Sequence, residues 1–572
     1  MRWSALLHLP PQSGHGFQFL ARKGLQAARH WLLIGWLLIT IAYPLGVLLQ
    51  KSLFASGELS LKHYVDFWHP DRTRSLEALW GSIWVSLLSV MFAGLTGTSL
   101  AVLFDRIEIP GRRILTALAT LPIVLPPLVG VVAFLFLLGE SGVLPRMLQA
   151  VFDLETPPFY LSGTTAVIVV HTYSFYVYFF LFTRAALKRL DGSAIEAARS
   201  LGASGFLIFY RVMLPQIMPA IRAASVLVFM ISMASFSAPF IFAGKTRILT
   251  VEIYNSKLQG NMDVAITQSV MLALISLLFL YFARRGERIL QSTGQKGIPL
   301  PPRPLKSPMA KWAAAVLAIL ASFILVLPHF MLLLISFVKN GTWTTQLLPD
   351  TFTLENYVNL FRDTRVAEPI MNSAKMAVLA TAGNVAIALI LAYWNSRRRW
   401  KLARFSEALV MLPWAIPGTV IAIALIVAFN RPHWFTLQTV LVGTFWILPL
   451  AYFIRHLPVV YRAAFSAFSR FDMAQEEAAR SLGAGELLVW RRVILPAIRP
   501  GVVAGGLLVL VMSLGEFVSS ILLYTFSNRP ISVAILSEIR LFNLGSAAAY
   551  GMFLTFLIFG IVYISSRWGE LE

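Results

Sequence analysis

One polar stretch occurs twice in this chain, 281 residues apart, and this duplication constrains the fold more than any other feature. The first copy covers residues 196–219 and the second covers residues 477–500, and 15 of the 24 aligned positions are identical without a gap. Both copies begin with the letters EAARSLGA and contain a Leu-Pro pair near their end. Two unrelated segments would not agree at this rate, so the chain contains an internal repeat.

Each copy is polar, although long apolar segments stand on both sides of it. Polar groups are costly within lipid, so both copies are predicted to lie outside the bilayer. Ser193 stands three residues before Glu196, and Asp472 stands three residues before Gln475. Both spacings are typical of a capping box and predict that a helix begins at the first residue of each pair.

The remainder of each copy predicts a tight turn and a second short helix. Gly202 and Gly483 are expected to end the first helix, because glycine adopts the left-handed conformation of a helix end without a steric penalty. Pro215 and Pro496 are expected to stop the short helix that follows. The prediction for each copy is therefore a stiff, polar helix–turn–helix projection on a membrane domain.

The chain as a whole is too apolar for a soluble protein. Of its 572 residues, 57% are hydrophobic and 13% are charged, whereas soluble domains carry about 25% charged residues. The formal charge of +21 could suggest a nucleic-acid partner, but 33 of the 48 Lys and Arg residues lie on one side of the predicted spans and 15 on the other. This bias assigns the basic side to the cytoplasm and argues against nucleic acid. The absence of cysteine excludes disulfides, thiolate metal sites and iron–sulfur clusters.

Twelve apolar segments are long enough to cross a bilayer. The predicted organisation is a basic cytoplasmic N-terminal segment at 1–30, a first half at 31–283, a basic, proline-rich cytoplasmic linker at 284–311, a second half at 312–566 and a cytoplasmic tail at 567–572. The spans are predicted at roughly 31–50, 77–103, 114–139, 163–187, 221–243, 264–283, 312–338, 373–395, 405–429, 435–458, 501–526 and 546–566. The first is read as an uncleaved span, and the linker is expected to be extended.

Six spans in each half give both halves the same orientation, so they form a parallel repeat about an axis along the membrane normal. A second similarity supports this reading, because residues 60–67 align with residues 353–360 at an offset of 293. The external loop between the third and fourth spans is expected to be about twenty residues long in the first half and only a few residues around Pro432 in the second. The predicted fold is an all-α polytopic membrane protein of about 12 transmembrane helices, arranged as two parallel six-helix repeats.

The duplicated stretch resembles the cytoplasmic loop of ABC import permeases. That loop reads Glu-Ala-Ala, three residues, Gly, nine residues, a branched apolar residue, one more residue and Leu-Pro, and both copies fit it in full. The resemblance extends over nearly the whole chain beyond residue 30 and implies the type I ABC importer transmembrane fold with two fused halves. In that family the loops dock into ATPase subunits, which implies a coupling role for Glu196, Ala197, Ala198, Gly202, Leu214, Pro215, Glu477, Ala478, Ala479, Gly483, Leu495 and Pro496.

The resemblance also implies partners and a location. They are a dimer of ABC ATPase subunits that binds ATP-Mg, a periplasmic substrate-binding protein, and the lipid bilayer of a bacterial inner membrane with both termini in the cytoplasm. The chain itself has no phosphate-binding loop, since the run from Gly244 to Thr246 has Pro239 where such a loop needs glycine. No catalytic or metal-ligating constellation stands out, so the chain is predicted to be a transport subunit without a cofactor of its own and not an enzyme.

The expected solute is ferric iron. Fused permeases of this size most resemble the ferric-iron family, to which the runs GEFVSS and TRILTVEIY are similar. Related permeases carry thiamine, phosphonates such as 2-aminoethylphosphonate, or polyamines, and these alternatives stay open. An ion-gradient-driven carrier is the alternative of another class. Such carriers need buried ionisable residues, which most of the predicted spans lack.

Glu516 is the clear charged exception within the spans. A charge at the bilayer centre costs about 2.5–3.5 kcal/mol on insertion scales, so Glu516 is expected to face a cavity or a partner. Its equivalent in the first half is Ser235, and the candidate translocation path consists of Ser235, Ser237, Glu516 and Ser519. The alternative is that Glu516 only pairs with a neighbouring helix. His171 is expected to be a hydrogen-bonded interior histidine rather than a ligand.

Overall fold

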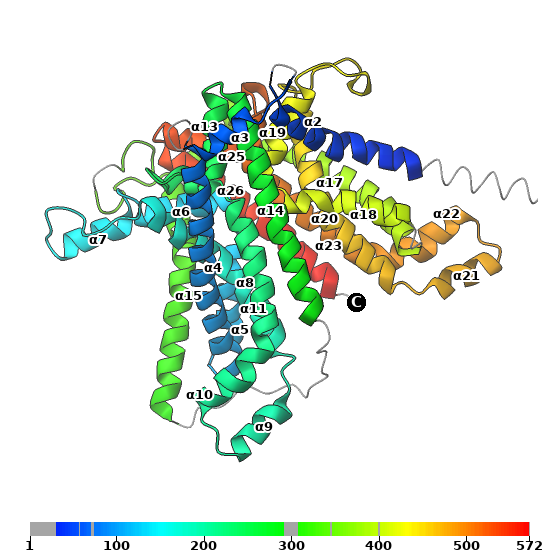
Figure 1. Ribbon diagram of the computed structural model, residues 1–572. Coiled ribbons are helices and arrows are strands. Elements are labelled where there is room, and N and C mark those ends of the chain that lie inside the picture. Colours follow the sequence, from blue (N-terminus) through cyan, green and yellow to red (C-terminus); the bar gives the residue numbers. More distant parts are fainter. Residues whose placement is uncertain are drawn as a thin grey trace, which may run out of the picture.

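The computed structural model describes residues 30–55, 58–69, 74–290, 307–343, 346–397 and 401–570, and most of them are helical (Figure 1). The predicted N-terminal segment before residue 30, the centre of the predicted linker and the last two residues of the tail lie outside the described residues. The linker was expected to be extended over its whole length, but both of its ends are helical. The helix α14 continues to Leu290, and α15 begins at Pro308.

The first half opens with a helical span at His30–Leu53, which contains the π-helical turn η1 (Leu38–Ala42) and α2 (Tyr43–Leu53). The following elements are β1 (Phe54–Ala55), β2 (Glu58–Leu59), α3 (Lys62–Trp68), α4 (Ser75–Arg106), α5 (Arg112–Thr120), η2 (Leu121–Val124), α6 (Pro127–Leu138), α7 (Val143–Val151), α8 (Gly163–Leu187), α9 (Gly192–Ser200), α10 (Gly205–Ile208), η3 (Phe209–Met213), α11 (Leu214–Met233), α12 (Ser237–Phe242), α13 (Leu249–Leu258) and α14 (Met262–Leu290). The two strands pair antiparallel, with Phe54 opposite Leu59.

The second half repeats this order. Its elements are α15 (Pro308–Ser336), α16 (Glu355–Arg362), α17 (Thr364–Arg397), α18 (Lys401–Ala415), α19 (Gly418–Phe429), η4 (Trp434–Thr436), α20 (Ile447–Arg470), α21 (Met473–Ser481), α22 (Glu486–Val489), η5 (Trp490–Ile494), α23 (Leu495–Leu514), α24 (Val518–Leu523), η6 (Phe526–Asn528), α25 (Ile531–Arg540) and α26 (Leu544–Glu570). Thus α3 corresponds to α16, α4 to α17, α5–α6 to α18–α19, α8 to α20 and α9–α14 to α21–α26, which confirms the parallel repeat.

Ten helices of the described chain are long and apolar enough to cross a membrane, and α18 with α19 forms an eleventh candidate that is bent by 111°. The break between the two helices lies at Ile416 and Pro417, because a proline removes a helical hydrogen bond and clashes with the preceding turn. These helices confirm an all-α polytopic membrane protein. The helix α20 stands where the fourth span of the second half was expected, but it is not among the eleven.

The boundaries of that fourth span were predicted wrongly. The helix α20 begins at Ile447, so the loop before it covers residues 430–446 rather than the few residues around Pro432 that were expected. Two turns form near the start of this loop. The Thr436 hydroxyl oxygen accepts a hydrogen bond from the backbone N–H of His433, and the Thr439 hydroxyl donates one to the carbonyl oxygen of Thr436. The residues of this loop are apolar enough to resemble a span, but α20 instead begins after them and ends in a basic last turn at Arg470.

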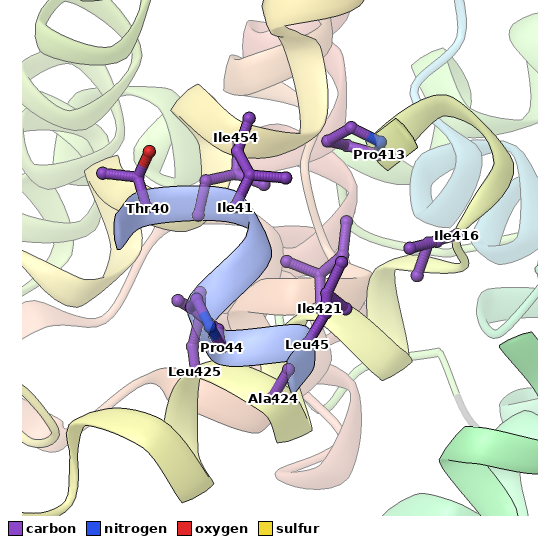
Figure 2. A pocket seen from close by; sticks show the side chains of 10 residues that line it. All are labelled: Thr40, Ile41, Pro44, Leu45, Pro413, Ile416, Ile421, Ala424, Leu425 and Ile454. Carbon is purple, nitrogen blue, oxygen red and sulfur yellow. The ribbon is translucent and has the colours of Figure 1, made fainter. Parts of the chain in front are cut away.

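The first span of each half packs against the other half. The helix α2 packs against α19, and α15 packs against α6. Figure 2 shows the first of these joints, where the lining side chains from η1, α2, the bend of α18–α19 and α20 are apolar except for Thr40. The remaining space is about 10 Å³, which is room for one water molecule at most. The joint is therefore packing between the halves and not a site for a solute.

The two halves lie together at the end of the molecule that carries α13 and α25, and they diverge toward the ends that carry α9 and α21 (Figure 1). The two copies of the duplicated stretch begin in α9 and α21 and continue into α11 and α23. They project from the helical bundles at separate places (Figure 1). This arrangement gives the molecule one joined end and one divided end.

Candidate functional site

Both copies of the duplicated stretch form a helix that begins at an aspartate. The Asp191 side chain accepts a hydrogen bond from the backbone N–H of Ser193 at 3.0 Å, and Asp472 accepts one from Ala474 at 3.0 Å. The predicted start at Asp472 is confirmed, whereas the predicted start at Ser193 is wrong. The Ser193 hydroxyl itself donates to Asp191 at 2.8 Å. Each aspartate therefore satisfies one of the N–H groups that the first helical turn leaves without partners.

The predicted glycine turns are confirmed. Gly202 has φ +78° and Gly483 has φ +83°, both in the left-handed region. The N–H of Ala203 donates to the carbonyl oxygen of Ala198 at 3.0 Å, and Gly202 donates to Arg199 at 2.9 Å. The second copy repeats both bonds. These pairs form the Schellman arrangement, which satisfies the last carbonyl groups of a helix and reverses the chain.

The two prolines do not stop the second short helix, which corrects the prediction. A single helical segment runs from Gly205 to Met233 and includes Pro215. The π-helical turn η3 lies just before this proline, and the Leu214 N–H bonds to the Phe209 carbonyl oxygen across it. The wider turn leaves room for a residue that lacks an N–H group. The turn η5 does the same before Pro496, so each projection continues without interruption into span five.

Both projections expose matching residues. Glu196 and Glu477 are exposed, as expected for residues that contact a partner. Large apolar side chains that the sequence analysis missed are also exposed, at 78–89% of their possible area. They stand at equivalent positions of the two copies and are Leu201, Phe206, Leu482 and Leu487. The available sequence signal was that both copies of a polar loop carry apolar residues at the same positions. Exposed apolar patches of this kind mark interaction sites.

The second projection is fastened to the membrane domain by ion pairs. The buried carboxylate of Glu476, on α21, pairs with Arg397 at the end of α17 and accepts a hydrogen bond from Arg480 at 2.9 Å. Burial alone would raise the pKa of Glu476, but the hydrogen bonds and charges of the two guanidinium groups outweigh burial and lower that pKa. At the equivalent place in α9 stands Ile195, which is buried and apolar.

In the first half the corresponding ion pairs join α4, α5 and α8 and do not include a residue of α9. Asp105, at the end of α4, contacts Arg112 of α5 at 2.6 Å and Arg184 of α8 at 2.7 Å. These pairs hold the ends of three helices together. The two halves thus place their carboxylate–guanidinium pairs at different helix joints.

Span five of each half breaks where the candidate path residues lie. In the first half, α11 ends at Met233 and α12 begins at Ser237. His171 of α8 contacts this break, with its Nε2 atom 2.8 Å from Ser235 Oγ and its Nδ1 atom 3.2 Å from Ser232 Oγ. Ser89 of α4 also lies 3.0 Å from Nδ1. The prediction of a hydrogen-bonded interior histidine is confirmed.

The break in the second half holds charge. Glu516 accepts hydrogen bonds from Arg455 Nη1 at 3.0 Å and from the backbone N–H of Ser519 at 2.9 Å. His456 Nε2 lies 3.7 Å from the Glu516 carboxylate, and its Nδ1 atom lies 3.0 Å from Ser513 Oγ. Arg455 and His456 were missed, although an arginine within the predicted span 435–458 was the available signal.

The two breaks meet between the halves. Phe236 and Phe517 follow Ser235 and Glu516 in the two copies, and their ring centroids lie 5.8 Å apart. Reciprocal contacts flank this pair. Lys257 of α13 donates to the Leu522 carbonyl oxygen at 2.7 Å, and the Arg540 guanidinium of α25 lies 5.6 Å from the ring centroid of Phe240. The structure therefore brings Ser235, Ser237, Glu516 and Ser519 to one joint around the pseudo-twofold axis.

Two regions of the chain, residues 68–292 and 384–568, match the family described as the binding-protein-dependent transport system inner membrane component. The chain belongs to this family. It is a multi-pass inner membrane protein and the permease subunit of an ABC importer, with one copy of the family domain in each half.

The permease is similar along most of its length to other transport permeases. It is 32% identical to "Probable ABC transporter permease protein y4fN" of Sinorhizobium fredii, over 88% of this chain and 90% of that one. It is 26% identical to the ferric transport system permease protein FbpB of Actinobacillus pleuropneumoniae, over 85% and 69%. It is 25% identical to the Fe(3+)-transport system permease protein FbpB 2 of Haemophilus influenzae, over 92% and 95%.

Proposed function

We propose that this permease moves ferric iron into the cytoplasm, receives it from a periplasmic binding protein, and is driven by a dimer of ATPase subunits that bind ATP-Mg. The observation that carries the mechanism is the pair of exposed projections at α9 and α21, one on each half. The observation that supports the solute is the similarity to two ferric permeases over 85–92% of the chain. The proposal that ATPase subunits drive transport therefore does not depend on which solute is carried.

Each projection is proposed to dock into one ATPase subunit. The exposed Glu196 and Glu477 supply polar contacts, and the exposed leucines beside the glycine turns supply apolar ones. Gly202 and Gly483 reverse the chain so that both kinds of side chain face one partner. The remaining coupling residues hold this shape, since Ala197, Ala198, Ala478 and Ala479 are small, and Leu214, Pro215, Leu495 and Pro496 connect the loops to span five.

The continuous helix from Gly205 to Met233 links the first loop to the central joint. When ATP draws the two ATPase subunits together, α9 and α21 approach each other. A stiff helix transmits this motion to its far end, where Phe236 and Phe517 meet. The joined end then opens, and the solute enters along Ser235, Ser237, Glu516 and Ser519. We assign the arrangement that is joined at one end and divided at the other (Figure 1) to the inward-open stage of this proposed cycle.

Other solutes and one other mechanism compete with this proposal. The same machinery carries 2-aminoethylphosphonate, thiamine or polyamines in related systems. An ion-gradient-driven carrier is favoured by one observation, the buried ion pair between Arg455 and Glu516 within the membrane domain, because such carriers use buried charges for coupling.

Reconstitution in liposomes distinguishes these functions. The full chain, its ATPase and its binding protein are expected to take up radioactive iron only when ATP is present inside the liposomes. The double variant Glu196→Ala with Glu477→Ala is expected to lose both ATPase association and uptake. Wild-type uptake by that variant would refute the docking role, and uptake by the chain alone on a proton gradient would establish the carrier instead.

A further inference from the structure

The two breaks in span five differ in a coordinated way. In the first half Ser235 contacts His171, and Val170 precedes that histidine. In the second half Glu516 takes the place of the serine, and Arg455 precedes His456. The two histidines make equivalent contacts, since each contacts the serine three residues earlier in span five than Ser235 or Glu516. A carboxylate and a guanidinium therefore occur together in one half, and both are replaced by uncharged residues in the other.

A third difference accommodates the arginine. The guanidinium lies against Gly418 at the start of α19, where a Cβ atom would be 1.6 Å from Arg455 Nη1. A side chain at position 418 would displace the guanidinium from this place, so glycine leaves room for the arginine here. The equivalent residue in the first half is Pro127. Three separate positions of the second half are thus adapted to one charged site.

The carboxylate is the fixed partner of this ion pair. The Glu516 side chain is 5% exposed, whereas that of Arg455 is 25% exposed. A backbone N–H orients the carboxylate, and the Glu516 carbonyl oxygen accepts hydrogen bonds from Ser520 Oγ at 2.7 Å and Ser532 Oγ at 2.8 Å. Arginine reaches the site on a long, flexible stem. The fixed charge of the site is negative, and the movable charge is positive.

Two buried hydroxyl groups near this pair are left without a partner. Thr419 follows Gly418 on α19, and Ser519 donates its N–H to Glu516 from α24. These two helices pack against each other. Both side chains are fully buried, and within the described part of the chain neither hydroxyl oxygen has a hydrogen-bond partner. An unpaired buried hydroxyl is costly, so a cation to which its oxygen can offer a lone pair is favoured here.

From this geometry we infer that Glu516 is a cation-binding site on the translocation path, and that Arg455 occupies it as a resident counter-charge which the arriving cation displaces. This inference rests on the proposed transport function and names the chemical class of the cargo. Carboxylate and hydroxyl oxygens are the ligands that hard metal ions prefer, and the same oxygens accept the N–H groups of an organic ammonium ion. The uncharged first half offers no such site, so one cation is bound per transporter.

The displaced arginine gives the path a reversible site. An empty carboxylate at this depth would be costly, and Arg455 neutralises it between transport events. A cation that arrives must compete with a tethered guanidinium, so it is held weakly enough to leave again. The position also places binding next to the joint, because Phe517 directly follows Glu516.

The test compares three variants of the complete transporter. Glu516→Gln is expected to lower uptake by about tenfold or more at every cation concentration. Arg455→Gln removes the competitor but leaves the buried carboxylate unpaired, so it is expected to lower the cation concentration needed for half-maximal uptake while also lowering the maximal rate. The double variant restores an uncharged pair but lacks the carboxylate, so it is expected to behave like Glu516→Gln. A purely structural ion pair predicts the opposite pattern, in which both single variants fail and the double variant recovers. Glu407→Gln, at the exposed pair with Arg462, is the matched control.

A second measurement does not depend on transport. The purified chain in nanodiscs is heated with gallium(III) nitrilotriacetate or with putrescine, since a bound ligand raises the melting temperature. A rise in the melting temperature of the wild-type chain that is absent in Glu516→Gln supports the cation site, whichever probe causes it. A rise with gallium supports a metal ion, whereas a rise with putrescine alone keeps the cation site and refutes the ferric solute. No rise with either probe, an equal rise in Glu516→Gln, or a loss of the rise only in Arg455→Gln overturns the inference.

Discussion

The ion pair beneath the second projection allows a quantitative test of how the coupling helix is held. Arg397→Gln removes the guanidinium that joins α17 to Glu476, whose side chain is only 4% exposed. Removing one partner of a buried pair costs about 3–5 kcal/mol. Arg480, which is half exposed, keeps its contact with the same carboxylate, so we expect about 2 kcal/mol. At 1.4 kcal/mol for each factor of ten, local opening of α21 becomes about thirtyfold more frequent.

Hydrogen–deuterium exchange of the full chain in nanodiscs measures this opening directly. Exchange over residues 473–481 is expected to rise by the stated factor, whereas residues 192–200 of α9 are held by Ile195 and serve as the internal reference. Glu407→Gln breaks an exposed pair, worth about 0–1 kcal/mol, and is expected to leave α21 unchanged. A change in α21 below about threefold, or an equal change in α9, would refute the reasoning.

The same pair predicts the pH dependence of α21. The pKa of Glu476 is lowered in the folded protein, so the unfolded segment binds more protons at acidic pH. The stabilisation is therefore fully present above the unfolded pKa of about 4.3 and is lost as pH falls through the lower folded pKa. Corrected exchange of α21 should be constant between about pH 6 and 8 and should increase below about pH 4. A midpoint near neutral pH would contradict the assignment to this carboxylate.

Three further predictions concern packing and turns. Gly97→Ala is expected to cost about 1–3 kcal/mol and to lower the melting temperature, because its Cβ would lie 2.3 Å from the Tyr176 carbonyl oxygen between α4 and α8. Gly46→Ala, which meets open space, is the control. Gly483→Ala is expected to cost about 1–2 kcal/mol at φ +83° and to weaken ATPase co-purification, whereas Gly485→Ser at a negative φ is expected to leave it intact. Phe517→Ala removes about 3–5 kcal/mol of packing and is expected to raise ATP hydrolysis without the binding protein; an unchanged rate would refute its role in closure.

Several local features of this permease followed from the sequence because the interactions that form them are close along the chain. The turns at Gly202 and Gly483 need only hydrogen bonds within six residues, and the apolar spans need only length and composition. Local signals also failed in places. Ser193 matched a cap pattern, but Asp191, two residues earlier, is the cap. Pro215 was read as a stop because the π-helical turn that accommodates it has no sequence signature of its own.

The sequence by itself determined that this chain is a duplicated, multi-pass helical protein with two polar projections, because a repeat, a hydropathy pattern and a helix cap are all encoded by neighbouring residues. Only the tertiary structure decided which side chains meet. Arg455 and Glu516 are 61 residues apart, and Phe236 and Phe517 are 281 apart, so their contacts depend on how spans four and five and the two halves pack. Glu516 was visible as a charge in a span, but its partner, its fixed orientation and its place at the central joint came from that packing.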